Sequence, residues 1–475
     1  MTWLWTTADL LAAVHGRPIG NMPQGVTGIS IDSRAIAPGE AFFAIKGDHV
    51  DGHDFASFAV ANGAALLVVS EGKLPALGRL VTPMIVVPDV LQALVDLGCA
   101  ARDRTAARII AVTGSVGKTT SKEMLRQALS PSGNVHASVA SFNNHWGVPL
   151  TLARMPETTD YGIFEIGMNH AGEIRPLVSM VRPHIAMVTT IAPAHLGNFR
   201  DLEEIAAAKA EIFDGVVPGG HAILNRDNAQ YAFLEAAARK AGVSHIHSFG
   251  ADPQAEFRLL DFTSGPDGSL LRAAVGRQTL EVPMGAPGRH IAENAVAVLG
   301  AVHLAGGDIE KAMAGLAAMQ AEKGRGRRYR LAKDGGWFTL IDDSYNANPA
   351  SMRAAIALLR DAEPHGRGRR IAVLGDMLEM GEHSPAVHAG LAEPLLEAAI
   401  GTVWLAGPDM ASLRDALPEG IEIDYRETAD ELAAHALQGV QPGDVLVVKS
   451  SKGTGFSRIV AALLDKYEAF PERER

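Results

Sequence analysis

A short glycine-rich run that ends in a lysine and two threonines carries the strongest chemical signal in the sequence. The run TGSVGKTT at residues 113–120 completes the β-branched segment Arg108–Thr113 and leads into a helical pattern. Glycines let a backbone curl so that its N–H groups point at phosphate oxygens, and a helix that starts there adds partial positive charge. Lys118 can neutralise outer phosphates, and the Thr119 hydroxyl can ligate Mg²⁺. The run therefore predicts a nucleotide-phosphate loop made by Gly114, Ser115, Gly117, Lys118, Thr119 and Thr120.

This loop is shorter than the general phosphate-loop pattern, in which four residues separate the first glycine from the Gly-Lys pair. Valine stands at position 112, where that pattern requires glycine, and the nearest glycine is Gly114. The alternative interpretation is a Gly/Ser turn followed by a surface lysine. The succession of strand, turn, lysine, paired threonines and helix favours the phosphate loop.

Two further residues near predicted strand ends could hold a metal ion. Glu165 lies at the end of the apolar segment Gly162–Ile166, and His195 follows the segment Ile185–Ile191. Ligands of parallel sheets collect at the carboxyl ends of the strands, where the phosphate loop also lies. A single strand-end Glu or His is more often structural. Three such groups on consecutive units favour a shared site for phosphate and metal.

Lys209 is expected on the inward face of a helix. The helical segment Leu202–Val216 places it in line with Ile205, Ile212 and Phe213. A buried ammonium must find a partner, lose its proton or be modified. The alternative is a lysine that buries its stem and keeps its ammonium in solvent. The pattern supports both interpretations equally.

Polar groups recur at other predicted helix starts and strand ends. His290 and Asn294 are four residues apart on one helical face, where they could bind a base or simply pack. The run DDSYNANP at residues 342–349 ends a strand and precedes a helix. It indicates either a ligand site or an Asn/Asp-rich turn with a helix cap. The strand-end loops 374–381 and 448–453 are also polar.

The order of the predicted elements divides the chain into three α/β domains. In residues 1–86, short strand-like runs alternate with a helical pattern in a small domain. In residues 87–323, apolar strands alternate with helices, which indicates a mostly parallel sheet covered on both faces. The Gly- and Arg-rich segment Lys323–Arg330 is typical of a joint. Residues 324–475 repeat the alternation and are expected to form a dinucleotide-fold-like domain.

Composition and charge restrict the class of protein. The 475 residues are 47% hydrophobic and carry a formal net charge of -11, which does not favour nucleic acid as a partner. The single cysteine, Cys99, allows neither an intrachain disulfide nor a multi-cysteine metal site. No segment reaches the about 18 consecutive apolar residues of a membrane span, and the first residues lack the pattern of a signal peptide. We therefore expect a cytoplasmic protein without membrane insertion.

Motifs spread along nearly the whole chain resemble those of the Mur ligases of peptidoglycan synthesis. In the first domain the resemblance lies in IDSR at 31–34 and in the segment Gly47–Phe55, and in the second it includes the short loop 113–120. Three further segments are typical of the family member that adds D-alanyl-D-alanine: SFNN at 141–144, DDSYNANP at 342–349 and LGDMLEMG at 374–381.

The resemblance implies an ATP-dependent amide ligase that uses Mg²⁺ and acts as a monomer. Its substrates would be UDP-N-acetylmuramoyl-tripeptide and D-alanyl-D-alanine. ATP would phosphorylate the tripeptide carboxylate, and the dipeptide amine would attack the resulting acyl phosphate, releasing ADP and phosphate. The three domains would then bind the UDP substrate, ATP and the amino donor, in that order along the chain.

The resemblance also implies roles for individual residues. The catalytic residues would be Lys118, Lys209 and His195. The metal ligands would be Thr119, Glu165, His195 and a carbamylated Lys209. Nucleotide contacts outside the phosphate loop would be His290, Asn294, Arg325 and Asp343. Substrate contacts would be Ser33, Arg34, Asn143, Asn144, Asn346 and Asn348. The hinge Gly-Arg of the family occurs twice, at 324–325 and 326–327, and we favour Arg325 over Arg327.

Two other functions compete with this interpretation. The first is another ligase of the same superfamily, such as a tripeptide-forming Mur ligase or a folylpolyglutamate synthetase. The Ser33-Arg34 segment argues against the folate enzyme, and the Asn346–Asn348 segment argues against the other Mur ligases. The second is a nucleotide-dependent switch protein. Such a protein would need neither the first-domain motifs nor the polar loops of the third domain.

Overall fold

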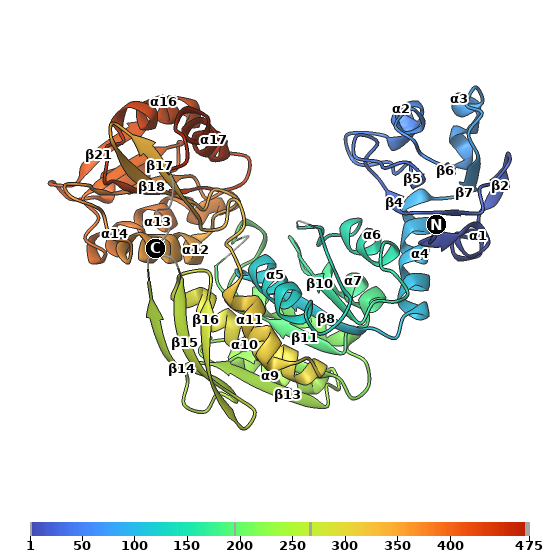
Figure 1. The fold of residues 1–475 in the computed structure, drawn as a ribbon, viewed down its shortest axis with the longest axis horizontal. Helices are drawn as coiled ribbons and strands as arrows, with labels where there is room; N and C mark the ends of the chain where they lie inside the picture. Colours follow the sequence, from blue (N-terminus) through green and yellow to red (C-terminus); the bar gives the residue numbers. More distant parts are fainter. Residues whose placement is uncertain (1, 140, 194–195, 266–267, 471–475) are drawn as a thin grey trace.

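Three large β-sheets and one two-stranded pair organise the described part of the chain. The computed structural model describes residues 2–139, 141–193, 196–265 and 268–470. Figure 1 shows the first and third sheets standing apart on opposite sides of the middle one. The predicted α/β fold class with three domains is confirmed.

The first sheet contains mostly parallel strands in the order β2-β7-β6-β5-β4, with β2 antiparallel to β7. Its strands are β2 (Arg17–Ile19), β4 (Ile29–Ser30), β5 (Ala41–Phe43), β6 (Leu66–Ser70) and β7 (Met84–Val87). Around it lie the pair β1 (Trp5–Thr6) and β3 (Gly25–Val26), and the helices α1 (Thr7–Val14), α2 (Ala56–Ala61) and α3 (Leu74–Leu77). The Trp5 indole donates a hydrogen bond to the Ala153 carbonyl (2.8 Å), which ties this part to the middle one.

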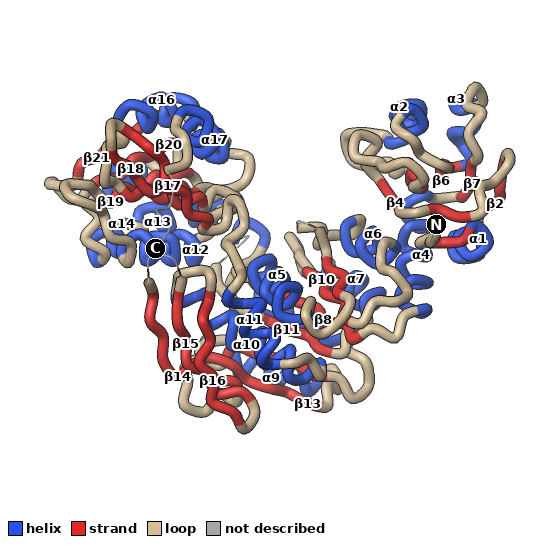
Figure 2. The backbone as a smooth tube through the Cα atoms, in the orientation of Figure 1, coloured by secondary structure: helices blue, strands red, loops and turns tan. Residues whose placement is uncertain are grey.

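The middle sheet has the strand order β16-β15-β14-β13-β12-β11-β8-β10-β9. The parallel strands are β8 (Arg108–Thr113), β9 (Val135–Ala137), β10 (Tyr161–Glu165), β11 (Ile185–Val188), β12 (His221–Asn225), β13 (His245–Gly250) and β14 (Phe257–Ser264). Helices cover both of its faces, as the sequence predicts and Figure 2 shows. They are α4 (Val90–Arg104), α5 (Lys118–Leu129), α6 (Gly147–Ala153), α7 (Ile174–Val181), α8 (Leu202–Ala210), α9 (Tyr231–Lys240), α10 (Arg289–Ala305) and α11 (Ile309–Ala317).

An antiparallel meander at one edge of this sheet was not expected from the sequence. Strand β14 pairs antiparallel with β15 (Ser269–Val275), which pairs antiparallel with β16 (Gln278–Met284). Their burial alternates along each strand, because one face packs on the core and the other meets solvent. The predicted helix Leu202–Val216 also ends early, since α8 gives way to a 3₁₀ turn at Glu211–Gly215.

The third sheet has the order β17-β18-β22-β19-β20-β21 and is parallel except for β17. Its strands are β17 (Arg327–Lys333), β18 (Gly336–Asp342), β19 (Arg370–Gly375), β20 (Thr402–Ala406), β21 (Glu422–Arg426) and β22 (Val445–Lys449). Its helices are α12 (Pro349–Arg360), α13 (Ser384–Ala389), α14 (Ala392–Glu397), α15 (Ala411–Ala416), α16 (Ala429–Gly439) and α17 (Phe456–Lys466). The loops after β18, β19 and β22 leave the same edge of the sheet, which gathers three of the polar segments noted in the sequence.

Among the described helices, none is both long enough and apolar enough to cross a bilayer.

Candidate active site

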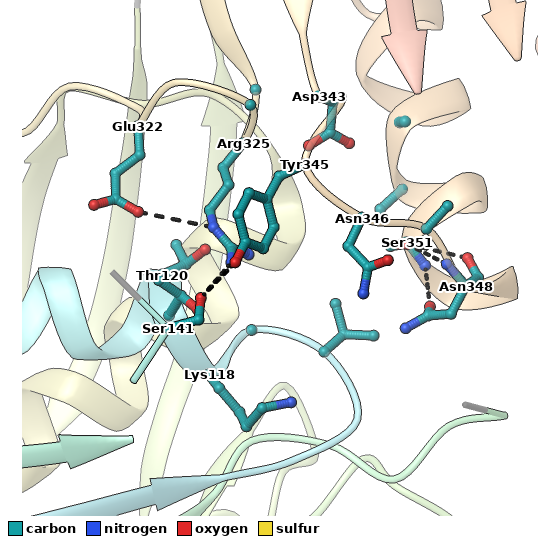
Figure 3. Close-up of a pocket in the computed structure, with 18 of the residues that line it drawn as sticks. Lys118, Thr120, Ser141, Glu322, Arg325, Asp343, Tyr345, Asn346, Asn348 and Ser351 are labelled. Carbon is teal, nitrogen blue, oxygen red and sulfur yellow. Dashed lines mark hydrogen bonds and ion pairs between the residues drawn. The ribbon is translucent and has the colours of Figure 1, made fainter. Parts of the chain in front are cut away.

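A cavity of about 580 Å³ lies where the middle and third sheets face each other. The middle part contributes the loop 115–120, the start of α10 and the segment 321–326. The third part contributes the loops after β18, β19 and β22. Figure 3 shows side chains from both parts converging on this space. A ligand here would touch both parts at once.

The predicted phosphate loop is built around two glycines with positive φ. Gly114 has φ 151°, and a Cβ there would lie 1.9 Å from the Thr189 hydroxyl oxygen. Gly117 has φ 89° and caps the N-terminus of α5. Residues with a side chain rarely adopt this backbone, which explains the glycines. The Lys118 ammonium donates a 2.7 Å hydrogen bond to the Gly114 carbonyl, and Lys118 lines the cavity.

Glu165 brings the phosphate loop and a second loop together. Its Oε2 accepts a 2.8 Å hydrogen bond from the Thr119 hydroxyl, and its Oε1 accepts a 2.7 Å bond from the Asn143 amide. Glu165 is buried at the end of β10, beside β8, the strand that carries the loop. The hydroxyl, carboxylate and amide oxygens are the hard donors that Mg²⁺ prefers. The expected grouping of Thr119 with Glu165 is therefore present.

Lys209 lies on the buried face of α8, with 1% of its surface exposed. The predicted inward orientation is thus confirmed. Burial, and to a lesser extent the Lys118 charge, lower the pKa of the Lys209 ammonium well below its usual range. Within the described part of the chain, no carboxylate pairs with it. His195, expected to act beside it, lies outside the described residues.

His290 and Asn294 project from the first turns of α10 into the same cavity. A Cβ on Gly117 would lie 2.7 Å from the Asn294 amide nitrogen, so Asn294 packs directly on the phosphate loop. Burial lowers the pKa of His290 to about 4, and the Lys449 charge is a smaller cause. The imidazole is therefore neutral near pH 7.

The arginines of the two Gly-Arg pairs in the joint lie in different surroundings. Arg325 lines the cavity, stacks 4.2 Å from the Tyr345 ring centroid and donates to the Ser141 hydroxyl at 3.4 Å. The Tyr345 hydroxyl also donates to Ser141, at 3.0 Å, as Figure 3 shows. Arg327 does not line this cavity and instead lies 5.5 Å from the Tyr329 ring. This geometry supports Arg325 as the nucleotide-side arginine.

The loop after β18 is fixed to the end of β22 by an ion pair in which the lysine is buried and the aspartate is partly buried. The Lys449 ammonium lies 2.8 Å from Oδ2 of Asp343 and 2.9 Å from the Asn346 carbonyl, to which it donates. Burial raises the pKa of Asp343, and the Lys449 charge opposes this. The Asn346 side-chain oxygen accepts from the Lys452 N–H at 3.2 Å. Asn346 therefore faces the cavity from a rigid loop.

Asn348 lines the cavity and also has a structural role. Its side-chain oxygen accepts a 2.9 Å hydrogen bond from the Ser351 N–H, and the Ser351 hydroxyl lies 3.0 Å from the Asn348 N–H, which donates to it. This capping box starts α12. Figure 3 shows the Asn348 side chain turned toward the helix. The helix-cap alternative raised by the sequence thus applies to Asn348.

Comparison with known proteins identifies the family to which the chain belongs. Three family patterns match in order: "Mur ligase family, catalytic domain" at residues 25–102, "Mur ligase middle domain" at 112–302 and "Mur ligase, glutamate ligase domain" at 326–452. The chain belongs to the Mur ligase family. The family resemblance inferred from the motifs is confirmed, and Mur ligases are ATP-dependent.

Relatives of this Mur ligase cover nearly its whole length. The UDP-N-acetylmuramoyl-tripeptide--D-alanyl-D-alanine ligase of Escherichia coli is 34% identical over 92% of this chain and 93% of its own. The enzyme of that name from Rickettsia prowazekii is 32% identical over 91% and 94%. The crystal structure of MurF from Acinetobacter baumannii superposes with a TM-score of 0.83 at 30% identity, covering 97% of this chain and 99% of that one.

Three of the predicted substrate residues of this Mur ligase do not line the cavity. Ser33 and Arg34 follow β4 in the first sheet's domain, and neither lines the cavity. Arg34 instead pairs with Asp32 at 2.8 Å. The Asn144 side chain accepts from the Gly147 N–H at 3.0 Å and so helps to start α6. Asn143, by contrast, lines the cavity beside Glu165.

Sequence reasoning did not predict several polar residues that line the cavity of this Mur ligase. They include Ser141, Glu322, Tyr345 and Lys449. Tyr345 and Lys449 stand in segments that the sequence marks as polar strand-end loops, so their position was available as a signal. Their partners come from distant segments, which no local pattern reveals.

Proposed function

We propose that this Mur ligase joins D-alanyl-D-alanine to UDP-N-acetylmuramoyl-tripeptide and hydrolyses ATP to ADP and phosphate in the process. The observation that carries the proposal is the shared cavity, in which a phosphate loop faces the polar loops of the third domain. The names of the relatives cited above support these substrates. The expected absence of a nucleic-acid partner follows from the net charge of -11.

The reaction needs an activated carboxylate, because oxide is a poor leaving group. Transfer of the γ-phosphoryl group of ATP to the carboxylate oxygen forms an acyl phosphate and ADP. The dipeptide amine then attacks the acyl carbon, phosphate leaves with the former carboxylate oxygen, and the amine loses a proton. The protein supplies positioning and charge neutralisation rather than a covalent intermediate.

The phosphate loop and Lys118 are the groups that we assign to the nucleotide. The Lys118 ammonium now binds the Gly114 carbonyl and can turn to a phosphate oxygen without leaving the cavity. Arg325 adds a second cation on the far side, held by Tyr345. His290 and Asn294 are proposed to contact the base. Ser115 contributes its backbone, because its hydroxyl donates to the Ala192 carbonyl.

The residues around Glu165 fit a Mg²⁺ ion. Thr119 and Glu165 already lie 2.8 Å apart, oxygen to oxygen, and both are buried at the cavity floor. When bound, the ion would neutralise phosphate charge and polarise the transferred group. His195 remains an expected ligand from the sequence. Asn143 holds the other oxygen of Glu165 and so orients the carboxylate.

Lys209 is proposed to carry a carbamate in the active enzyme. Carbon dioxide reacts only with a neutral amine, and the lowered pKa of Lys209 favours that form. The reaction joins the amine nitrogen to carbon and releases one proton, so the side chain changes from a potential cation to an anion. A negative group there would complement Lys118 and the Mg²⁺ charge, whereas an ammonium would repel both.

The first domain is proposed to bind the UDP part of the acceptor, through Ser33 and Arg34. We divide the chain into residues 1–86, 87–323 and 324–475 for UDP, ATP and amino donor. Since the first and third parts stand apart in Figure 1, the acceptor must span them or the domains must close. Closure would also expel water from the acyl phosphate.

We further propose that the enzyme acts as a monomer in the cytoplasm.

An amino-donor assay tests the proposal directly. The purified protein, given ATP, Mg²⁺ and UDP-N-acetylmuramoyl-tripeptide, should release phosphate only when D-alanyl-D-alanine is added. Diaminopimelate, lysine and glutamate serve as alternative donors, each offered with the matching shorter acceptor. Phosphate release with one of these donors instead would assign the chain to another ligase of the superfamily.

A further inference from the structure

Three histidines cluster at the opposite end of the middle sheet from the phosphate loop. His221 is the first residue of β12, and His245 is the first residue of β13. The two are register partners, and His247 follows two positions along β13. Side chains two apart on a strand share a face of the sheet. All three imidazoles therefore lie on one face, at the amino ends of neighbouring strands.

Two of these imidazoles already present nitrogens at a metal-binding separation. His221 Nδ1 lies 3.0 Å from His247 Nε2. Two nitrogens on one tetrahedral zinc ion, at bonds of about 2.0–2.1 Å, would be about 3.3 Å apart. The two rings are 5.2 Å apart between centroids. A small widening of this pair would admit the ion.

The Glu256 carboxylate orients the His247 ring from the side opposite His221. His247 Nδ1 lies 3.0 Å from both carboxylate oxygens of Glu256, so this nitrogen carries the proton and donates it. The lone pair of Nε2 then faces His221. A carboxylate behind a ligating histidine is the usual arrangement at metal sites, since it sets the tautomer and raises the basicity of the ligand. The His247 ring is further held by stacking on Phe257 at 5.7 Å.

His245 can supply the third ligand. Its ring stacks on His221, with centroids 4.9 Å apart and planes 27° apart. The three rings do not yet direct three nitrogens at one point. His245 is exposed at the strand start, so its ring can turn by giving up the stack on His221.

We propose that His221, His245 and His247 form a binding site for a divalent transition metal such as Zn²⁺, with Glu256 orienting His247. Three imidazoles suit Zn²⁺, Ni²⁺ or Cu²⁺, whereas Mg²⁺ prefers oxygen ligands. The ion would replace the proton between His221 and His247, and His221 would keep its proton on Nε2 instead. It would clamp the starts of β12 and β13, away from the cavity of the proposed reaction.

A second group of possible metal ligands, in the third domain, is a weaker candidate for a metal site. Asp376, His388 and Asp409 bring ligand atoms together. However, His388 Nε2 accepts a 2.9 Å hydrogen bond from the Met377 N–H, and its Nδ1 lies 2.7 Å from the Ser384 carbonyl, to which it donates. Both nitrogens of this imidazole are therefore committed to the backbone, and His388 serves to hold the loop after β19.

Zinc titration of the full-length protein tests the site. Calorimetry with Zn²⁺ is carried out in excess Mg²⁺ and ADP, so that the cavity is occupied by its own ligands. The variants are His245→Ala and Glu256→Gln, both at exposed positions, together with His247→Ala. The control is His15→Asn, because His15 is exposed on the first domain and asparagine tolerates its φ of 50°.

The wild type and the His15→Asn control should bind one equivalent of Zn²⁺ that the His247→Ala variant lacks. Glu256→Gln should weaken binding about tenfold, as loss of an orienting carboxylate does.

Zn²⁺ should also raise the thermal midpoint of the wild type but not of His245→Ala. Bound Co²⁺ should give a tetrahedral absorption spectrum that His245→Ala loses. Unchanged Zn²⁺ affinity in both His245→Ala and Glu256→Gln would overturn the proposal.

Discussion

The Thr119 hydroxyl donates a 2.8 Å hydrogen bond to Glu165, although the two residues are 46 positions apart in the chain. Parallel pairing of β8 with β10 produces this contact, because both strands end at the same edge of the sheet. Thr119 opens the helix after β8, and Glu165 ends β10. The metal-facing part of the site is therefore a direct product of sheet topology.

Lys118 should be required for phosphoryl transfer, since its ammonium lies at the mouth of the phosphate loop. Lys118→Ala should lower turnover by about a hundredfold or more, the scale expected for loss of a preorganised charge. Phosphate release under saturating substrates measures this. The matched control is Lys240→Ala on the exposed end of α9, which should behave as wild type. Near-normal turnover of a folded Lys118→Ala variant would remove Lys118 from the mechanism.

Asn346 should position the amino donor, because its exposed side chain faces the cavity from a loop that Lys449 holds. Asn346→Ala should raise the KM for D-alanyl-D-alanine more than the KM for ATP. Steady-state kinetics with each substrate varied in turn give both constants. If the two constants rise equally, Asn346 maintains the loop rather than the donor site.

Asn348 should show its capping role in local stability. Asn348→Ala removes the acceptor for the Ser351 N–H and should destabilise the first turn of α12 by about 1 kcal/mol. Hydrogen exchange of the α12 amides measures this change. Asn348→Ser keeps an acceptor and serves as the control. Exchange rates that do not change in Asn348→Ala would show that the cap is dispensable and leave substrate binding as its role.

Lys209→Ala should be nearly inactive, because it removes both the length and the charge of the proposed carbamate. Short-chain carboxylic acids should restore part of the rate by supplying a carboxylate in the vacated space. Bicarbonate should not, since no amine remains to react. Wild-type activity of Lys209→Ala would contradict the proposal, as would a high-resolution map of active enzyme showing an unmodified amine.

His290 should make the folded protein sensitive to acid. Its pKa is lowered to about 4, below the about 6.5 of an unfolded histidine. Between these values the unfolded chain binds the extra proton, so the stability that depends on His290 is lost as pH falls through this window. His290→Gln should therefore lose less stability between about pH 8 and about pH 5 than the wild type. Thermal midpoints at both pH values measure the difference, and equal losses would show that the pKa of His290 is not lowered in the folded state.

Much of the site could be predicted because its residues stand in local patterns. The glycines and lysine of the loop 113–120 predict a phosphate site. In the structure Gly114 and Gly117 have positive φ angles, which explains why glycine stands at both positions. The inward face of Lys209 follows from helical spacing, and its burial agrees. The antiparallel meander β14–β16 was not predicted, because apolar residues such as Leu270 also lie on its exposed face and obscure the two-residue alternation of a strand.

The sequence by itself determined the α/β class and membership of the Mur ligase family and predicted the phosphate loop, since each rests on local patterns of neighbouring residues. Only the tertiary structure separated Arg325 from Arg327, because Arg325 precedes β17 and packs on Tyr345 in the cavity, whereas Arg327 opens β17 beside Tyr329. It also showed that Asn348, but not Asn346, caps α12, and it paired Lys449 with Asp343. The Lys449–Asp343 pair joins residues 106 positions apart, and a contact of that kind depends on how the sheet brings strand ends together.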